Sequence, residues 1–310
     1  MKEQTKINIE TIKGEFLMNI NWYPGHMVKT KRQVIEDLKL IDVVVELLDA
    51  RIPMSSQNPD LQQIAKNKKK IIVLNKCDLA DEQENKKWVT YFEKKGIKAI
   101  LTDANSGFGI NEVTRQIENI MKDDITKNAE KGRIGKSIRV MILGIPNVGK
   151  SSFINRISKK TSAGVGNKPG FTKQKQWIRL SNNIELLDTP GVLWPKFENE
   201  KVALNLSFVG TIKDDILEKT EIAFYLLKFL LENYKENVTE RYKILNEEFE
   251  NIVENNQNPN EQIMDIFRLI GKRRGAIVSG GNVDEEKVAN LLLDDFRTGK
   301  LGRISLEKVK

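Results

Sequence analysis

Residues 144–152 read GIPNVGKSS and match the pattern G-x-x-x-x-G-K-[ST], with Gly144 and Gly149 as the two glycines. The apolar run VMILG precedes the match and the helical pattern KSSFINRIS follows it, which is the context that a phosphate-binding loop requires. Glycines at these positions let backbone N–H groups converge on phosphate oxygens at a helix N-terminus. The stretch therefore predicts an α/β nucleotide-binding domain, in which Lys150 reaches the β- and γ-phosphates and Ser151 ligates Mg²⁺.

A second stretch, NKCD at residues 75–78, follows the apolar run IIVL and fits a guanine-recognition loop. The Asp78 carboxylate can accept from guanine N1–H and from the 2-amino group, and adenine offers neither donor. Asn75 can contact the base edge and tie this loop to the phosphate loop, while the stem of Lys76 lies against the base. Cys77 is interpreted as a small packing residue. In the later stretch TDANSG, the backbone N–H of Ala104 can approach guanine O6.

The stretch DTPG at residues 188–191 ends another apolar run, IELL. An acid that leaves a buried strand beside a phosphate loop is placed to hold the metal, so we assign this role to Asp188, acting through a water. Gly191 would bring its N–H to the γ-phosphate. Thr172, between the two stretches, is a candidate second ligand for Mg²⁺.

The order of these stretches is unusual, because the base-reading parts come before the phosphate loop. Four apolar runs, at residues 41–50, 70–76, 97–103 and 137–144, predict strands buried on both faces, and helical patterns separate most of them. Such alternation predicts a parallel sheet with helices on both sides. Strands of a parallel sheet can be relinked without changing their neighbours, so we interpret the order as a circular permutation of one guanine-nucleotide domain.

The pattern changes after residue 193. Two closely spaced runs before it, KQWIRL and NIELLDTPG, predict an antiparallel pair of strands, whereas almost every later segment has helical spacing. We therefore expect a tail at residues 1–18, the permuted nucleotide domain at residues 19–198, and a smaller all-helical domain at residues 199–310.

Composition limits the class of protein. The 310 residues are 39% hydrophobic and 30% charged, as in a folded globular protein. No apolar run approaches the ~20 residues of a membrane helix, and the first residues lack a signal-peptide core, so we expect a cytoplasmic protein without a membrane partner. Cys77 is the one cysteine, which excludes an intramolecular disulfide and a cysteine-cluster metal site.

The net charge of +8 is concentrated in one band. Residues 126–179 contain thirteen Lys or Arg residues and one acid, Glu130, whereas residues 201–310 contain seventeen bases and nineteen acids. Such a band either binds phosphates of a nucleotide or an RNA or is a solvated surface. The candidate RNA-binding residues are Lys159, Lys160, Lys173 and Lys175, with Lys272, Arg273 and Arg274 as a second group.

Six stretches together resemble the circularly permuted ribosome biogenesis GTPase A family. They are WYPGHMVK, DARIP, NKCD, GIPNVGKSS, DTPGVLWPK and GKLGRISLE, and the resemblance runs from about residue 20 to the C-terminus. It implies a Ras-like GTPase domain, a helical RNA-binding domain and a role in late assembly of the large ribosomal subunit. It also implies a K⁺-assisted site with Asn147 as the candidate ligand. Asp103 departs from the family pattern, in which a serine or asparagine is usual.

Catalysis needs a residue that orients the attacking water. Ras-like enzymes use a glutamine after the DxxG glycine, and this chain has Val192 there, so we expect slow intrinsic hydrolysis that the ribosomal subunit stimulates. His26, the one histidine, could supply the missing group, because an imidazole ordinarily titrates near neutral pH. The resemblance also points to His26 as catalytic. It could instead contact rRNA or cap the following helix.

The leading hypothesis is a monomeric GTPase that uses GTP, Mg²⁺ and K⁺ and times a late step of large-subunit maturation through rRNA. The loop at residues 188–193 leads into the helical domain, so its release on hydrolysis would act on whatever that domain holds. The alternatives are a non-enzymatic GTP-dependent RNA-binding switch and a GTPase of another RNA process, such as tRNA modification. The predicted GTP-binding residues are Asn75, Lys76, Cys77, Asp78, Asp103, Ala104, Asn147, Val148, Gly149, Lys150, Ser151, Ser152 and Gly191.

Overall fold

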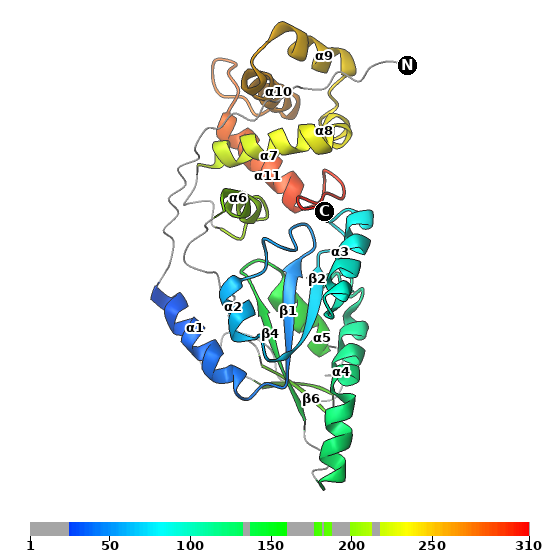
Figure 1. Cartoon of the computed structure of the whole chain (residues 1–310). Coiled ribbons are helices and arrows are strands. Elements are labelled where there is room, and N and C mark those ends of the chain that lie inside the picture. The colour runs from blue at the N-terminus through cyan, green and yellow to red at the C-terminus, as the bar shows by residue number, and fades with distance from the viewer. Residues whose placement is uncertain are drawn as a thin grey trace. The chain divides into compact units, whose positions relative to one another are not determined.

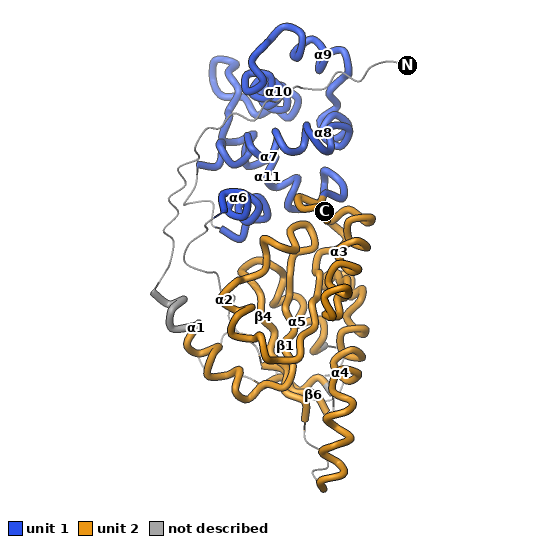
Figure 2. The backbone as a smooth tube through the Cα atoms, viewed as in Figure 1, with its two compact units in different colours: residues 1–19, 199–304 blue, residues 20–198, 305–310 orange. Residues whose placement is uncertain are grey.

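The computed structural model describes residues 25–132, 137–159, 177–181, 183–187, 199–212 and 218–309, and the side chains of residues 25–31, 159 and 181 are outside this description. The chain divides into two compact units, coloured separately in Figure 2. The described parts of residues 20–198 form one unit together with residues 305–309, and the described parts of residues 199–304 form the other. We call them the nucleotide unit and the helical unit.

The nucleotide unit contains a six-stranded sheet in the order β3-β2-β1-β4-β6-β5. Strands β1, β2, β4 and β6 of this sheet are labelled in Figure 1. The strands are β1 (Val43–Asp49), β2 (Lys69–Asn75), β3 (Lys98–Leu101), β4 (Ile138–Gly144), β5 (Trp177–Ser181) and β6 (Ile184–Leu187). All neighbouring pairs are parallel except β5 and β6, which confirms the predicted antiparallel pair. Every residue of β1 is buried, as its continuous apolar sequence predicts for a central parallel strand.

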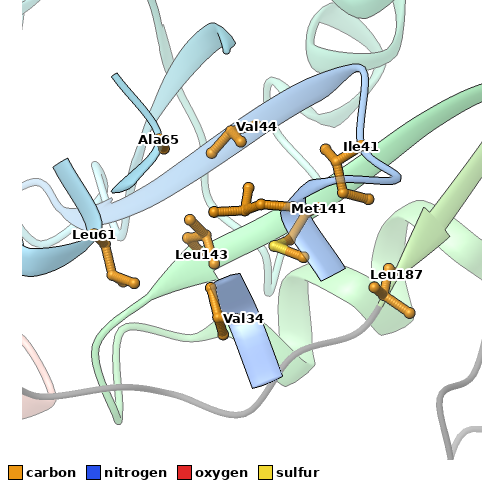
Figure 3. Close-up of a cluster of buried hydrophobic side chains, with 9 residues drawn as sticks. Val34, Ile41, Val44, Leu61, Ala65, Met141, Leu143 and Leu187 are labelled. Carbon is orange, nitrogen blue, oxygen red and sulfur yellow. The ribbon is translucent and has the colours of Figure 1, made fainter. Parts of the chain in front are cut away.

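Helices cover both faces of this sheet. They are α1 (Gly25–Leu38), α2 (Pro59–Ile64), α3 (Glu82–Lys94), α4 (Ile110–Glu130) and α5 (Lys150–Lys159). One face packs against α1 and α2 through a cluster in which Val34 and Leu61 meet Val44 and Met141 (Figure 3). Trp88 and Phe92 of α3 continue the core on that face. The opposite face is covered by α4 and α5, which contact each other. This architecture confirms the predicted α/β class.

The helical unit contains, among the described residues, α6 (Glu200–Phe208), α7 (Lys219–Asn233), α8 (Lys235–Tyr242), α9 (Asn246–Asn255), α10 (Pro259–Arg274) and α11 (Glu285–Arg297). Helices α7, α10 and α11 pack against one another, with Leu226, Ile266 and Leu292 fully buried. Arg241 pairs with the buried Asp295 at 2.9 Å, and this pair joins α8 to α11. No helix in the described parts of the chain is long and apolar enough to cross a membrane.

The two ends of the helical unit were expected at residues 199 and 310, and the structure differs at the second of them. Residues 305–309 pack with the nucleotide unit, because their side chains and amides find partners there. Ser305 and Leu306 are buried, with 0% and 3% of their surface exposed. Sequence periodicity could not predict this, since five residues without a helical or strand pattern carry no signal of their packing partner.

Candidate guanine-nucleotide site

The phosphate loop joins the end of β4 to the start of α5, as predicted. Asn147 and Gly149 have positive φ angles of 61° and 92°, so the loop turns back on itself before the helix begins at Lys150. A Cβ on Gly149 would lie 2.4 Å from Asn75 Nδ2, and one on Gly144 would lie 2.9 Å from the Leu47 carbonyl oxygen. The glycines therefore serve two purposes in this fold, a left-handed turn and close contact with neighbouring strands.

The side chain of Asn75 joins three loops. This residue ends β2 and is only 2% exposed. Its Nδ2 donates to the Val148 carbonyl oxygen at 2.9 Å, and its Oδ1 accepts from Ala104 N at 3.1 Å and from Thr102 Oγ1 at 3.2 Å. The structure thus brings the base-reading loops and the phosphate loop together, although they are far apart in the sequence. It also gives the Ala104 N–H an acceptor within the protein, so a guanine O6 would share that donor with Asn75.

Lys76 makes a second connection to the phosphate loop. Its Nζ donates to the Asn147 carbonyl oxygen at 2.8 Å and forms an ion pair with Asp49 at 3.1 Å. Lys76 itself has a positive φ of 57°, which is uncommon for a residue other than glycine. Cys77 is buried in the core beside α3, as expected of a packing residue, and Asp78 is exposed on the turn that follows β2.

Asp49 and Arg51 belong to this site and were assigned no role from the sequence. Arg51 donates from Nε and Nη2 to the two carboxylate oxygens of Asp49, at 3.0 and 2.8 Å, and both side chains are 1% exposed. Burial alone raises the pKa of the Asp49 carboxyl, but the charges of Arg51 and Lys76 outweigh it and hold that pKa well below its usual range. The signal was present in the sequence, because Asp49 ends a buried strand and is followed by a cation.

Asp103 has a local role in this structure. Its carboxylate accepts the backbone N–H groups of Asn105 at 2.8 Å and Ser106 at 3.1 Å. Burial raises the pKa of this carboxyl, but the hydroxyl of Ser106, the two backbone N–H groups and the charge of Arg156 outweigh it, so the net shift is downward. The carboxylate therefore holds the turn after β3 together.

The remaining predicted residues fall into two groups. Lys150, Ser151 and Ser152 form the first turn of α5, where the helix dipole favours an anion, and both serines are exposed. The predicted ligands Thr172 and Asp188, together with Gly191, lie outside the described residues. So do Lys160, Lys173 and Lys175, and the side chains of His26 and Lys159.

Comparisons with known proteins agree with this geometry. The family model described as 50S ribosome-binding GTPase matches residues 139–267. Ribosome biogenesis GTPase A of Bacillus cereus is 46% identical over 290 residues, covering 94% of both chains, and that of Thermotoga maritima is 32% identical, covering 93% of this chain and 94% of the relative. Mitochondrial ribosome-associated GTPase 1 of Mus musculus is 31% identical, covering 93% of this chain and 90% of the relative.

Solved structures show the same similarity to GTPases of this kind. The GNP-bound YlqF of T. maritima is 29% identical and has a TM-score of 0.59, and the match covers 90% of this chain and 98% of that one. Its GDP-bound structure has a TM-score of 0.60 at 28% identity, with 89% of this chain and 99% of that one covered. These matches confirm the predicted GTPase activity and favour it over the alternative of a non-enzymatic switch. The chain therefore belongs to the ribosome biogenesis GTPase A family, with the nucleotide-binding motifs in permuted order.

Proposed function

We propose that this GTPase binds the precursor of the large ribosomal subunit through rRNA and times a late maturation step by hydrolysing GTP. The observation that carries the proposal is the pair of hydrogen bonds from Asn75 and Lys76 to the phosphate loop, which joins the two halves of a permuted nucleotide site. The relatives' name, ribosome biogenesis GTPase A, and the description of the family model as a 50S ribosome-binding GTPase support the choice of partner. We further propose that the protein acts as a monomer in the cytoplasm.

The chemistry assigned to the site follows from its described residues. Lys150 would contact the β- and γ-phosphates, Ser151 would ligate Mg²⁺, and Asn147 is the proposed K⁺ ligand. A cation held by Ser151 or Asn147 would supply positive charge beside the β- and γ-phosphate oxygens, where negative charge develops during hydrolysis. Thr172, Asp188 and Gly191 keep their proposed metal and γ-phosphate roles on the strength of the sequence.

The proposed timing mechanism follows from chain connectivity. Residues 188–198, outside the described parts, run directly into the helical unit, which begins at residue 199. A γ-phosphate contact made in this segment and lost on hydrolysis would act on that unit through the shortest covalent path. GTP and GDP would then give two states of different affinity for the subunit.

Co-sedimentation with each ribosomal subunit tests the proposal. The protein should sediment with the large subunit when it holds a non-hydrolysable GTP analogue and less so with GDP, and large subunits should stimulate its turnover. Equal binding in both nucleotide states would contradict the timer. Preference for the small subunit, or stimulation by tRNA in place of the subunit, would contradict the choice of partner.

We predict that guanine specificity depends on Asp78. Asp78→Asn exchanges an acceptor for a donor, which suits the 2-carbonyl of xanthine better than the 2-amino group of guanine. GTP affinity should fall by about tenfold or more, which is the effect of losing ~1.4 kcal/mol, and affinity for xanthosine triphosphate should rise. Fluorescent nucleotide titration measures both. Asp123→Asn on the exposed surface of α4 is the matched control. Unchanged GTP binding in Asp78→Asn would remove the base-reading assignment.

The basic residues should contribute phosphate contacts. Replacing Lys159, Lys160, Lys173 and Lys175 with alanine should weaken subunit binding and lower the salt slope by about one per lost contact. Lys272 and Arg274 are exposed at the C-terminus of α10 and form the second group, while Arg273 is already paired with Glu248. The exposed Lys94 of α3, changed to alanine, is the control. An unchanged salt slope would show that the basic residues are a solvated surface.

A further inference from the structure

The C-terminal tail, residues Ser305–Val309, is bound to the nucleotide unit along its whole length. Ser305 Oγ accepts from Asp81 N at 3.1 Å, and Leu306 N donates to the Arg51 carbonyl oxygen at 2.9 Å. Farther along, Trp88 Nε1 donates to the Glu307 carbonyl oxygen at 3.4 Å, and Val309 N donates to Glu84 Oε2 at 3.3 Å. The tail thus contacts both the segment after β1 and the start of α3.

Glu307 makes the densest of these contacts. Its carboxylate accepts the backbone N–H groups of Met54 at 2.6 Å and Ser55 at 3.0 Å, and it also accepts from the Ser55 hydroxyl. A carboxylate that accepts several hydrogen bonds makes charge-assisted contacts, which are stronger than neutral ones. Leu306 and Glu307 therefore fix the segment of residues 51–55 from both of its ends.

A series of side-chain contacts connects Arg51, the first residue of that segment, to the phosphate loop. Arg51 pairs with Asp49 at 2.8 Å, Asp49 pairs with Lys76 at 3.1 Å, and Lys76 donates to the Asn147 carbonyl oxygen at 2.8 Å. Arg51 and Asp49 are each 1% exposed, so the first of these pairs is excluded from water. An ion pair in such a place depends strongly on its geometry, because a misplaced partner leaves a buried charge uncompensated.

We propose that Glu307 is a positioning residue of the guanine-nucleotide site, which acts on Lys76 and the phosphate loop through Arg51 and Asp49. The inference rests on the proposed assignment of Lys76 and Asn147 to that site. By linkage, the docked tail strengthens nucleotide binding, and bound nucleotide strengthens docking of the tail by the same factor. The helical unit ends at residue 304, so the tail follows it directly in the chain and binds the nucleotide unit through hydrogen bonds.

The first test measures nucleotide affinity in the full-length chain. Glu307→Gln keeps the shape but presents an amide group to backbone donors, so affinity for GDP and GTP should fall by about fivefold or more, the lower range of coupling between sites. Glu307→Ala should have the larger effect. Glu118→Gln, on the exposed surface of α4 in the same unit, is the matched control and should bind normally. Normal affinity in both Glu307 variants would overturn the proposal.

A double-mutant cycle separates positioning from general stability. In a Lys76→Met background, the contacts from Glu307 through Arg51 and Asp49 no longer end at an ammonium group. Glu307→Gln should therefore cause no further loss of nucleotide affinity in that background. An equal loss in both backgrounds would show that Glu307 only stabilises the fold and would overturn the proposal. Lys76→Met alone tests the site: unchanged affinity in that variant would reject the nucleotide-site assignment, and a Glu307 effect would then have another cause.

Hydrogen exchange on the unmodified protein gives a test that survives if the Glu307 variants fail to fold. The amides of Leu306 and Val309 are donors in the docked tail, so saturating GDP should slow their exchange by about fivefold or more, the lower range of coupling between sites. Exchange at these two amides that is the same with and without GDP would overturn the proposal.

Discussion

Replacing Gly149 with alanine is expected to lower GTP and GDP affinity by about 10²-fold or more. The new Cβ would lie 2.4 Å from Asn75 Nδ2, a distance at which one group must move, and the φ of 92° is itself unfavourable for alanine. Backbone strain of this kind costs ~1–3 kcal/mol, and losing the hydrogen bond of a buried amide costs about as much again. Displacing Asn75 would break its bond to Val148 and separate the base loop from the phosphate loop.

The structure offers a matched control for this prediction. Gly96 also has a positive φ, 74°, but a Cβ there would have no atom within 4 Å. Gly96→Ala should therefore lose some stability through backbone strain and keep its nucleotide affinity. Titration with a fluorescently labelled GDP measures affinity and thermal unfolding measures stability, and both are carried out on each variant. Equal affinity loss in both variants would show that strain, and not contact with Asn75, explains the result.

Replacing His26 with alanine should lower subunit-stimulated GTP turnover by about 10²-fold or more while leaving GTP and subunit binding intact. That factor is the usual size of positioned acid–base assistance. The reason is chemical, because Val192 cannot orient a water molecule and an imidazole can. The backbone of His26 lies in the first turn of α1, a helix that Val34 anchors to the sheet.

Single-turnover and steady-state assays with large subunits measure this effect, and binding is checked in parallel by co-sedimentation. Glu36→Gln, exposed on the same helix, is the control. Loss of subunit binding with residual turnover intact would assign His26 to ribosome contact. Full stimulated activity in His26→Ala would exclude both roles and leave the structural one.

The predicted site residues differ in how far local sequence could place them. Gly149, Lys150 and Asn75 could be predicted from the sequence, because each recognition loop is a short continuous motif at the end of an apolar run. The local role of Asp103 was not found, since its two N–H donors become visible only in the folded turn. The contact of Asp49 with Lys76 was not found, because Lys76 follows another strand, β2, and the pairing of β1 with β2 brings the two side chains together.

The sequence by itself determined the α/β class, the antiparallel strand pair and the permuted order of the motifs. Continuous apolar runs of strand length specify burial on both faces, and this local information survives relinking of the chain. Only the tertiary structure decided that residues 305–309 leave the helical unit and that Glu307 contacts Ser55, 252 positions away. Such contacts depend on which surfaces the strand order and helix packing bring together, and no periodicity within five residues encodes that.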